Sequence, residues 1–385
     1  MESYDYIIAG GGAAGLSLAY HLIRSDLKDR SILIVDKDAK NQNDRTWCFW
    51  IDHSTDFDPI LYHSWGQVRF TSRDFDGVIP LGKYRYNMIR GLDFYNFTRE
   101  NLSHFPKVHF LKGSITAIKD QAGGALVVVD GNPFFGKFVF DSLIGPDFIL
   151  PDPGRYHYLK QHFAGWVIET DRPVFDPDTP ILFDFRTPQN GAMRFMYILP
   201  DSSTQALVEY TLFSASLLTD AEYEQALADY LRNTLCISTY RVLEKECGMI
   251  PMTDNPFPRR ASLHVLNIGT KGGRVKPSSG FAFLRIQNDS AAIVQSLIKF
   301  GHPFSIPSTP RRYQLFDSIL LQIMFRHPEE CAHIFSMLFK KNSPERLFRF
   351  LDERGPLMND ILLMTSLPIY RFIEALFRLK GLQRV

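Results

Sequence analysis

The most constraining feature of the sequence is a glycine pattern near its start. Gly10, Gly12 and Gly15 follow an apolar run that predicts a strand. The stretch from Ala13 to Arg24 then predicts a helix. In such a turn Gly10 permits the tight bend, Gly12 lets the backbone approach a pyrophosphate, and Gly15 allows the helix to pack closely on the strand. Free N–H groups at the helix start attract anions, so the pattern predicts a βαβ unit that binds a dinucleotide.

An acidic residue completes this dinucleotide pattern. Asp36 ends the next predicted strand, which begins at Ile32. A carboxylate about 20 residues beyond the last glycine accepts hydrogen bonds from ribose hydroxyls. The same negative charge disfavours a 2′-phosphate at this site.

A second glycine-rich segment lies at residues 267–280, between a predicted strand at 264–268 and a helix predicted from about Asp289 to Phe300. Gly269, Gly273 and Gly280 belong to it. Two such segments suggest FAD, whose isoalloxazine needs backbone N–H groups where negative charge accumulates on reduction. Two separate dinucleotides, or a plain surface loop, are the alternatives for the second segment.

The order of predicted elements indicates an α/β fold. Strands near Val108 and His264 are expected to complete a parallel sheet, and several strand-like runs between 164 and 212 predict a second, mostly antiparallel sheet. We expect a Rossmann-like FAD-binding domain formed by residues 1–150 and 251–310, interleaved with an antiparallel-sheet substrate domain at 151–250. Pro151 to Pro153 marks the boundary between them, and residues 311–385 form a helical C-terminal region.

Composition and charge exclude several classes of protein. The formal net charge is +1, which gives no electrostatic footprint for nucleic acid. The four cysteines form no CxxC pair and are expected to be reduced thiols. The start lacks the pattern of a signal peptide, and no apolar stretch is long enough for a spanning helix. We expect an intracellular protein whose membrane contact, if any, is peripheral.

Six segments in this order resemble the lycopene cyclase family, and together they cover nearly the whole chain. They are DRTWCFW at 44–50, QHF at 161–163 with Trp166, DFR at 184–186, LVEYT at 207–211, GMIPM at 248–252, and the 267–280 loop. The resemblance implies a flavoprotein with the two-domain fold of aromatic-hydroxylase-type monooxygenases. It further implies a linear carotenoid substrate, lycopene, whose acyclic ψ ends become β-ionone rings. Reduced FAD would serve as the cofactor of a reaction that has no net redox change, and NAD(P)H would be the source of the electrons that reduce it.

Two other functions remain open at this stage. One is an FAD-dependent monooxygenase or reductase that acts on a polyprenoid with NAD(P)H. The other is a flavin-binding protein without catalysis that serves as a partner at a membrane surface. The family resemblance favours a cyclase in the cytoplasm, peripheral on the inner face of the cell membrane.

Glu209 is the catalytic candidate that the resemblance assigns, because the family's motif places a glutamate ahead of a threonine and LVEYT matches it. Ring closure requires protonation of a terminal alkene, attack of the next double bond on the cation, and loss of a proton. A carboxyl group in an apolar pocket can deliver the proton, and a carboxylate can stabilise the cation. Both roles are open, and Asp184 is the second candidate acid. Without the family, a solvated charge on a half-buried strand would explain Glu209.

The resemblance also implies cofactor contacts at Arg45, in the first motif, and at Arg90, for which a surface arginine is the alternative. Related flavoproteins carry an aspartate after the first glycine of the second loop, whereas Thr270 follows Gly269 here. The aromatic fraction of 14% suits a long apolar tunnel. We expect about half of eight aromatic candidates to contact substrate, since buried aromatics mostly fill cores: Trp47, Phe49, Trp50, Trp166, Phe183, Phe185, Tyr197 and Tyr210.

Two features near the C-terminus have alternative interpretations. His327, Glu330, Cys331 and His333 carry metal-ligand chemistry, but their spacing straddles a helix start and favours a solvated helical face without metal. The segment from Leu367 to Leu379 has apolar and basic residues at helical spacing. It is expected either to lie on a membrane surface or to pack into the core.

Overall fold

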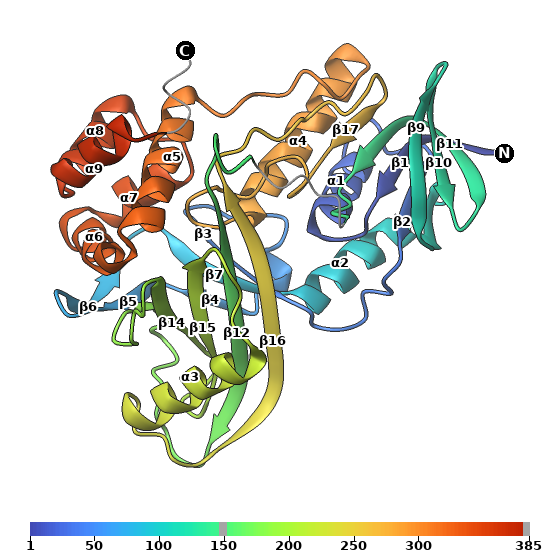
Figure 1. The fold of residues 1–385 in the computed structure, drawn as a ribbon. Coiled ribbons are helices and arrows are strands. Elements are labelled where there is room, and N and C mark those ends of the chain that lie inside the picture. The colour runs from blue at the N-terminus through green and yellow to red at the C-terminus, as the bar shows by residue number, and fades with distance from the viewer. Residues whose placement is uncertain (146–151, 380–385) are drawn as a thin grey trace.

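The computed structural model describes residues 1–145 and 152–379, so Pro151, at the predicted domain boundary, lies outside the described part. Figure 1 shows two large sheets at different ends of the molecule, with a group of helices from the C-terminal part beside the second one. This arrangement confirms the α/β fold with a second sheet and a helical C-terminal region.

The first sheet has the strand order β8-β2-β1-β11-β10-β9, with β17 paired to β11. The pairs among β8, β2, β1, β11 and β17 are parallel, whereas β9 and β10 are antiparallel. The predicted strands near Val108 and His264 therefore both join this sheet. The strand bounds are β1 (Glu2–Ala9), β2 (Ile32–Asp36), β8 (Val108–Lys112), β9 (Ile115–Gln121), β10 (Gly124–Val129), β11 (Asn132–Asp141) and β17 (Val265–Asn267).

Three helices pack on one face of this sheet, namely α1 (Ala13–Ile23), α2 (Gly91–Ser103) and α4 (Phe283–Phe300). Helix α4 begins earlier than the predicted start at Asp289. The reason is that Phe283 and Ile286 already bury their side chains against α1 and β17. Asp289 lies inside this helix, and its buried carboxylate accepts a hydrogen bond from Arg259 Nη2 at 2.7 Å.

The second sheet has the order β16-β12-β15-β14-β13-β5-β6 and is antiparallel except for the β13–β5 pair. Strands β5 and β6 come from the N-terminal part of the chain, so the interleaving is deeper than the sequence pattern suggests. The bounds are β5 (Gln67–Thr71), β6 (Asp76–Pro80), β12 (Tyr158–Thr170), β13 (Ile181–Asp184), β14 (Met193–Pro200), β15 (Gln205–Ser214) and β16 (Tyr240–Thr253).

The two faces of the second sheet have different neighbours. Helix α3 (Asp220–Asn233) covers one face, and Thr219 caps its start through a capping box with Glu222. The other face lies against a three-stranded sheet of β3 (Thr46–Ile51), β4 (His63–Trp65) and β7 (Arg85–Arg90). A short 3-10 turn, η1 (Asp58–Ile60), precedes β4.

The C-terminal helices pack against the same side as the three-stranded sheet and share one hydrophobic core with it. They are α5 (Arg311–Arg326), α6 (Pro328–Lys341), α7 (Pro344–Leu351), α8 (Leu357–Thr365) and α9 (Ile369–Phe377). Among residues 1–145 and 152–379, no helix combines the length and the apolar character needed to cross a bilayer.

Candidate active site

The first glycine turn has the geometry of a phosphate cradle. Gly10 has a φ of +107°, and a Cβ on Gly15 would lie 1.9 Å from the carbonyl oxygen of Gly10. Gly12 is different, because a Cβ there would meet no heavy atom within 4 Å. The carboxylate of Asp36 accepts a hydrogen bond from Gly11 N at 2.6 Å, which holds this acid beside the turn. Gly15 is thus required by packing, whereas Gly12 leaves open space above the start of α1.

The second glycine loop lies against the first. Gly269, Gly273 and Gly280 all have positive φ values, of 59°, 70° and 75°. A Cβ on Gly269 would lie 2.7 Å from the Cβ of Ala14 in α1. The two segments that the sequence assigns to one cofactor therefore meet, as FAD requires.

Polar atoms without partners lie beside the far end of this loop. Gln161 Oε1 and Ser279 Oγ are buried and form no hydrogen bond within the protein. A Cβ on Gly280 would lie 1.9 Å from Gln161 Oε1, so the amide and the loop backbone are in contact. The N-terminus of α1 likewise has no side-chain cap. These free donors and acceptors, together with the open space at Gly12, fit FAD. The start of α1 would bind the pyrophosphate, and the loop around Gly280 would bind the flavin ring.

Two glutamates meet on the face of β12 that contacts this loop. Gln161 and Gly165 lie on the same face, because side chains alternate along a strand, and their Cα atoms are about 13 Å apart. Gly165 pairs with Glu209 of β15 on one side and with Glu246 of β16 on the other. The carboxyl groups of the two glutamates are within hydrogen-bonding reach of each other. We refer to Glu209 and Glu246 as the carboxyl pair.

The surroundings of Glu209 favour its protonated form. Burial, followed by the charge of Glu246, raises the pKa of Glu209 to about 8. Thr211 Oγ1 donates a hydrogen bond to Glu209 Oε1, and Thr46 Oγ1 donates one to Glu246 Oε2 at 3.0 Å. Burial also raises the pKa of Glu246. This environment therefore shifts Glu209 toward its carboxylic acid form, which is the form that a general acid needs.

Hydroxyl and thiol groups surround the carboxyl pair. Tyr197 lies opposite Glu209 on β14, and its hydroxyl is 2.5 Å from that of Tyr86 on β7. Cys48 of β3 contacts both tyrosines. Burial raises the pKa of Cys48 to about 12 and those of both tyrosines well above 10, so all three stay neutral.

Asp184 does not join the carboxyl pair. Its buried carboxylate accepts hydrogen bonds from Arg186 Nε at 2.9 Å and from the hydroxyl of Tyr230 at 2.5 Å. Tyr230 belongs to α3, which covers the face of the sheet opposite to Glu209. The pairing of β13 with β14 shifts register between Ile181 and Asp184, which helps to turn this side chain toward α3. The structure thus places Asp184 apart from the carboxyl pair, with Arg186 and Tyr230 as its partners, and its role as a second catalytic acid stays a prediction.

The two predicted arginine contacts lie at the ends of neighbouring strands. Arg45 immediately precedes β3 and pairs with Asp44 at 3.0 Å. Arg90 ends β7, pairs with Asp93 at 2.7 Å, and stacks its guanidinium over the ring of Tyr62. Both side chains are engaged by neighbours within the protein, and their contact with a cofactor stays a prediction.

An apolar pocket lies between the second glycine loop and the C-terminal helices. Its wall includes Trp50 of β3, Phe183 of β13, Ser279 of the loop, Phe281 directly after the loop, and Phe372 of α9. Glu209 does not line it. Instead, one face of β3 runs from Thr46, at the carboxyl pair, past Cys48 to Trp50 at the pocket.

The eight aromatic candidates divide between this region and the core. Trp50 and Phe183 line the pocket, and Tyr197 lies beside Glu209. Trp166 and Tyr210 belong to the opposite face of the sheet, where they pack with α3. The others are core residues near these sites: Trp47 and Phe49, which contact Phe283, and Phe185, which stacks on Phe183.

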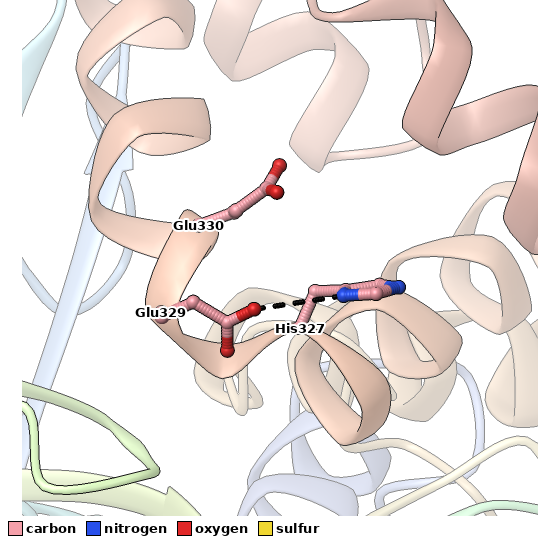
Figure 2. A group of neighbouring side chains, drawn as sticks. All are labelled: His327, Glu329 and Glu330. Carbon is pink, nitrogen blue, oxygen red and sulfur yellow. Dashed lines mark ion pairs between the residues drawn. The ribbon is translucent and has the colours of Figure 1, made fainter.

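The cluster with metal-ligand chemistry is divided among different partners. Figure 2 shows His327, Glu329 and Glu330 at the junction of α5 and α6, with ligand atoms within 4.8 Å of one another. Arg371 of α9 donates to Glu330, with its Nε at 2.8 Å, and thereby supplies positive charge to this cluster. The predicted solvated face holds only in part, because Cys331 is buried, while His333 pairs with Asp74. The cluster is mainly an ion-pair network that joins α6 to α9.

A sequence profile described as "Lycopene cyclase protein" matches residues 5–377. The chain belongs to the lycopene cyclase family. It is 37% identical over 261 residues to a lycopene beta-cyclase of Paracoccus sp., covering 65% of this chain and 61% of that protein. It is 28% identical over 316 residues to the chloroplastic neoxanthin synthase of Solanum tuberosum, covering 77% and 61%. The chain thus spans about three fifths of the length of these curated relatives.

The fold of this family member is shared with flavoproteins. A flavoprotein/dehydrogenase of Cytophaga hutchinsonii aligns with a TM-score of 0.66 and 10% identity, covering 98% of this chain and 99% of that one. At this identity the likeness concerns the fold alone. It agrees with the arrangement of the two glycine segments around one cofactor site.

Sequence reasoning missed Glu246, Cys48 and Tyr86. Glu246 lies two residues before the GMIPM motif, and Cys48 lies inside the DRTWCFW motif, yet neither stood out as an acid or thiol of the site. The available signal was Gly165, a glycine inside the strand predicted from Ala164 to Thr170, since a glycine within a strand often marks a close approach. This glycine gives no information on which strands pair with β12, so it could not identify Glu246 as the neighbour of Glu209.

Proposed function

We propose that this chain cyclises an acyclic end of a linear carotenoid, as a lycopene beta-cyclase does. The observation that carries the proposal is the buried position of Glu209 beside Glu246, on the face that contacts the cofactor loop, where burial raises the pKa of Glu209 to about 8. Glu209 adds its proton to the terminal double bond, and the next double bond closes the ring on the resulting cation. Loss of one proton from the ring to a carboxylate gives a product of unchanged mass. Reduced FAD, with NAD(P)H as electron source, would supply negative charge that stabilises a cation when it is bound.

The apolar pocket supports a long apolar substrate. Its aromatic and aliphatic wall excludes water and offers π faces to a passing cation. In the proposal the polyene lies in the pocket, and its end group follows β3 past Cys48 to Glu209. Cys48, Tyr86 and Tyr197 are neutral and stay close to this path, so they do not take the proton.

A membrane surface is the proposed source of the carotenoid. Helices α8 and α9 line the pocket with Leu363, Met364 and Phe372. The same two helices leave large apolar side chains in solvent, so they provide both an exposed apolar surface and part of the pocket wall. We name this surface the α8–α9 surface and define it by Leu357, Met358, Ile361, Leu362, Ile369, Tyr370, Ile373 and Phe377.

The function is tested with purified protein loaded with FAD, a reductant, and lycopene in liposomes. The expected product has the mass of lycopene and the absorption spectrum of a carotenoid with a cyclic end. A product heavier by oxygen or hydrogen, formed with matching consumption of NAD(P)H, would establish the monooxygenase or reductase alternative. Bound flavin without any product would favour a non-catalytic protein.

A further inference from the structure

We propose that Glu246 is the second carboxyl group of the site and shares one proton with Glu209 across the gap left by Gly165. Glu246 is a positioning residue in this arrangement, because it keeps the acid proton on Glu209. The role in catalysis rests on the proposed function, whereas the sharing of the proton is a property of the protein alone.

The strand pairing explains why the two carboxyl groups meet. β15 and β16 are separated by β12, so Glu209 and Glu246 lie two strands apart, about 10 Å between their Cα atoms. Any side chain at position 165 would stand between them. A Cβ there would lie 3.3 Å from Glu246 Cγ and 3.4 Å from Glu209 Cβ, which is already tight. Glycine is therefore the residue that lets the two glutamates approach each other.

The hydrogen bonds around the pair account for a single shared proton. Thr211 donates to Glu209 and Thr46 donates to Glu246, so each carboxyl group has one hydroxyl donor. Two carboxylates in contact repel each other, and a single proton between them removes this repulsion. With one proton, Glu209 donates to the Glu246 carboxylate, which also accepts from Thr46. The like charge of Glu246 contributes, after burial, to the raised pKa of Glu209.

The other titratable groups near the pair do not compete for this proton. Cys48 on β3, Tyr86 on β7 and Tyr197 on β14 are kept neutral by burial, which raises their pKa values. Glu244, on the same strand as Glu246, adds a negative charge that further raises the pKa of Glu246. Within the range in which an enzyme works, the proton therefore moves only within the carboxyl pair.

The test follows the infrared band of protonated carboxyl groups against pH in the FAD-loaded protein. Subtraction of the Glu209→Gln spectrum assigns the wild-type signal to Glu209. In Glu246→Gln the midpoint of this signal should move to lower pH by about one unit or more, because the neighbouring charge is gone. Gly165→Ala retains both carboxyl groups but forces them apart. This variant should therefore move the midpoint of the Glu209 signal to lower pH as well. Glu169→Gln, an exposed glutamate of β12 paired with Arg241, is the matched control.

The outcomes separate the inference from the proposed function. If the midpoint of the Glu209 signal is unchanged in both Glu246→Gln and Gly165→Ala, the proposal of a shared proton is wrong. It is also wrong if activity falls equally at every pH while this midpoint stays unchanged. If the midpoint of the Glu209 signal moves to lower pH and cyclisation is lost at a correspondingly lower pH, the result supports the shared proton. A shifted midpoint in a protein that forms no cyclic carotenoid supports the shared proton and rejects the proposed function. If Glu246→Gln does not fold, Gly165→Ala alone decides.

Discussion

Lys276 of the second glycine loop forms a buried ion pair with Asp317 of α5, with Nζ and Oδ1 2.9 Å apart and side chains only 3% and 5% exposed. Glu353, which follows α7, accepts from the same ammonium group at 3.2 Å. Ser278 donates to Asp317 at 2.5 Å. The cofactor loop and the helices that wall the pocket are therefore joined by one buried polar network, and each part depends on the other for its position.

Lys276→Met should destabilise this junction. Removing one member of a buried ion pair leaves an uncompensated charge and typically costs about 3–5 kcal/mol. We expect a lower melting temperature and weaker flavin retention, measured by thermal denaturation and by flavin absorbance after gel filtration. The double variant Lys276→Met/Asp317→Leu should recover part of the loss. Additive losses in the double variant would show that the two residues are not energetically coupled.

Gly12→Val should remove FAD without harm to the fold. A Cβ at this position meets no protein atom, and its φ of −85° is open to any residue, so only a ligand above α1 would collide with the side chain. We expect loss of bound flavin with an unchanged melting temperature of the flavin-free protein. Gly15→Ala is the contrast, because its Cβ would collide with the Gly10 backbone and lower stability. Full flavin content in Gly12→Val would contradict the assigned pyrophosphate position.

Glu209→Gln should abolish most of the cyclisation. The amide keeps the volume but has no acid proton, and loss of a positioned acid costs ~10² or more in rate. Flavin content should remain near wild type, and Glu169→Gln should be active. Asp184→Asn should lower the melting temperature, since it weakens the bonds from Arg186 and Tyr230, while the folded enzyme still cyclises. Wild-type turnover by Glu209→Gln would remove this residue from the mechanism.

Stability should depend on pH through Glu209. Between pH 4.5 and about pH 8 the unfolded chain releases the Glu209 proton while the folded chain keeps it. The folded state then binds more protons, so the free energy of unfolding falls as pH rises through this range. Activity should fall above about pH 8, where the acid form is lost. Melting curves of wild type and Glu209→Gln should diverge with increasing pH, with the variant becoming relatively more stable; parallel curves would argue against a raised pKa.

The α8–α9 surface should bind vesicles through its exposed apolar side chains. Ile361, Ile373 and Phe377 are 46%, 48% and 79% exposed, so replacing all three with serine should change stability little. We expect the triple variant to lose flotation with vesicles of phosphatidylcholine and phosphatidylglycerol. Leu263→Ser, a change at a 65% exposed leucine outside the C-terminal helices, is the control. Equal flotation of the triple variant and wild type would exclude this surface.

Local patterns in the sequence determined the cofactor half of the site. The Gly10 turn, the helix that follows it and the nearby Asp36 form one short βαβ unit, and backbone geometry there requires glycine at fixed spacing. The alternation in β15 likewise placed Glu209 on a single face with Leu207 and Thr211. These features could be predicted because the residues that interact lie close together along the chain.

Only the tertiary structure decided the catalytic half. The alternation of side chains along a strand assigns Glu209 and Asp184 each to one face of a strand. It does not tell which of the two faces packs against α3 and which packs against β3. The pairing of β12 with both β15 and β16 brings Glu246 to Glu209, although the two are far apart in the sequence. Asp184 turns the other way because the register of β13 shifts. Strand register and the packing of sheets depend on long-range contacts, which no local pattern of residues contains.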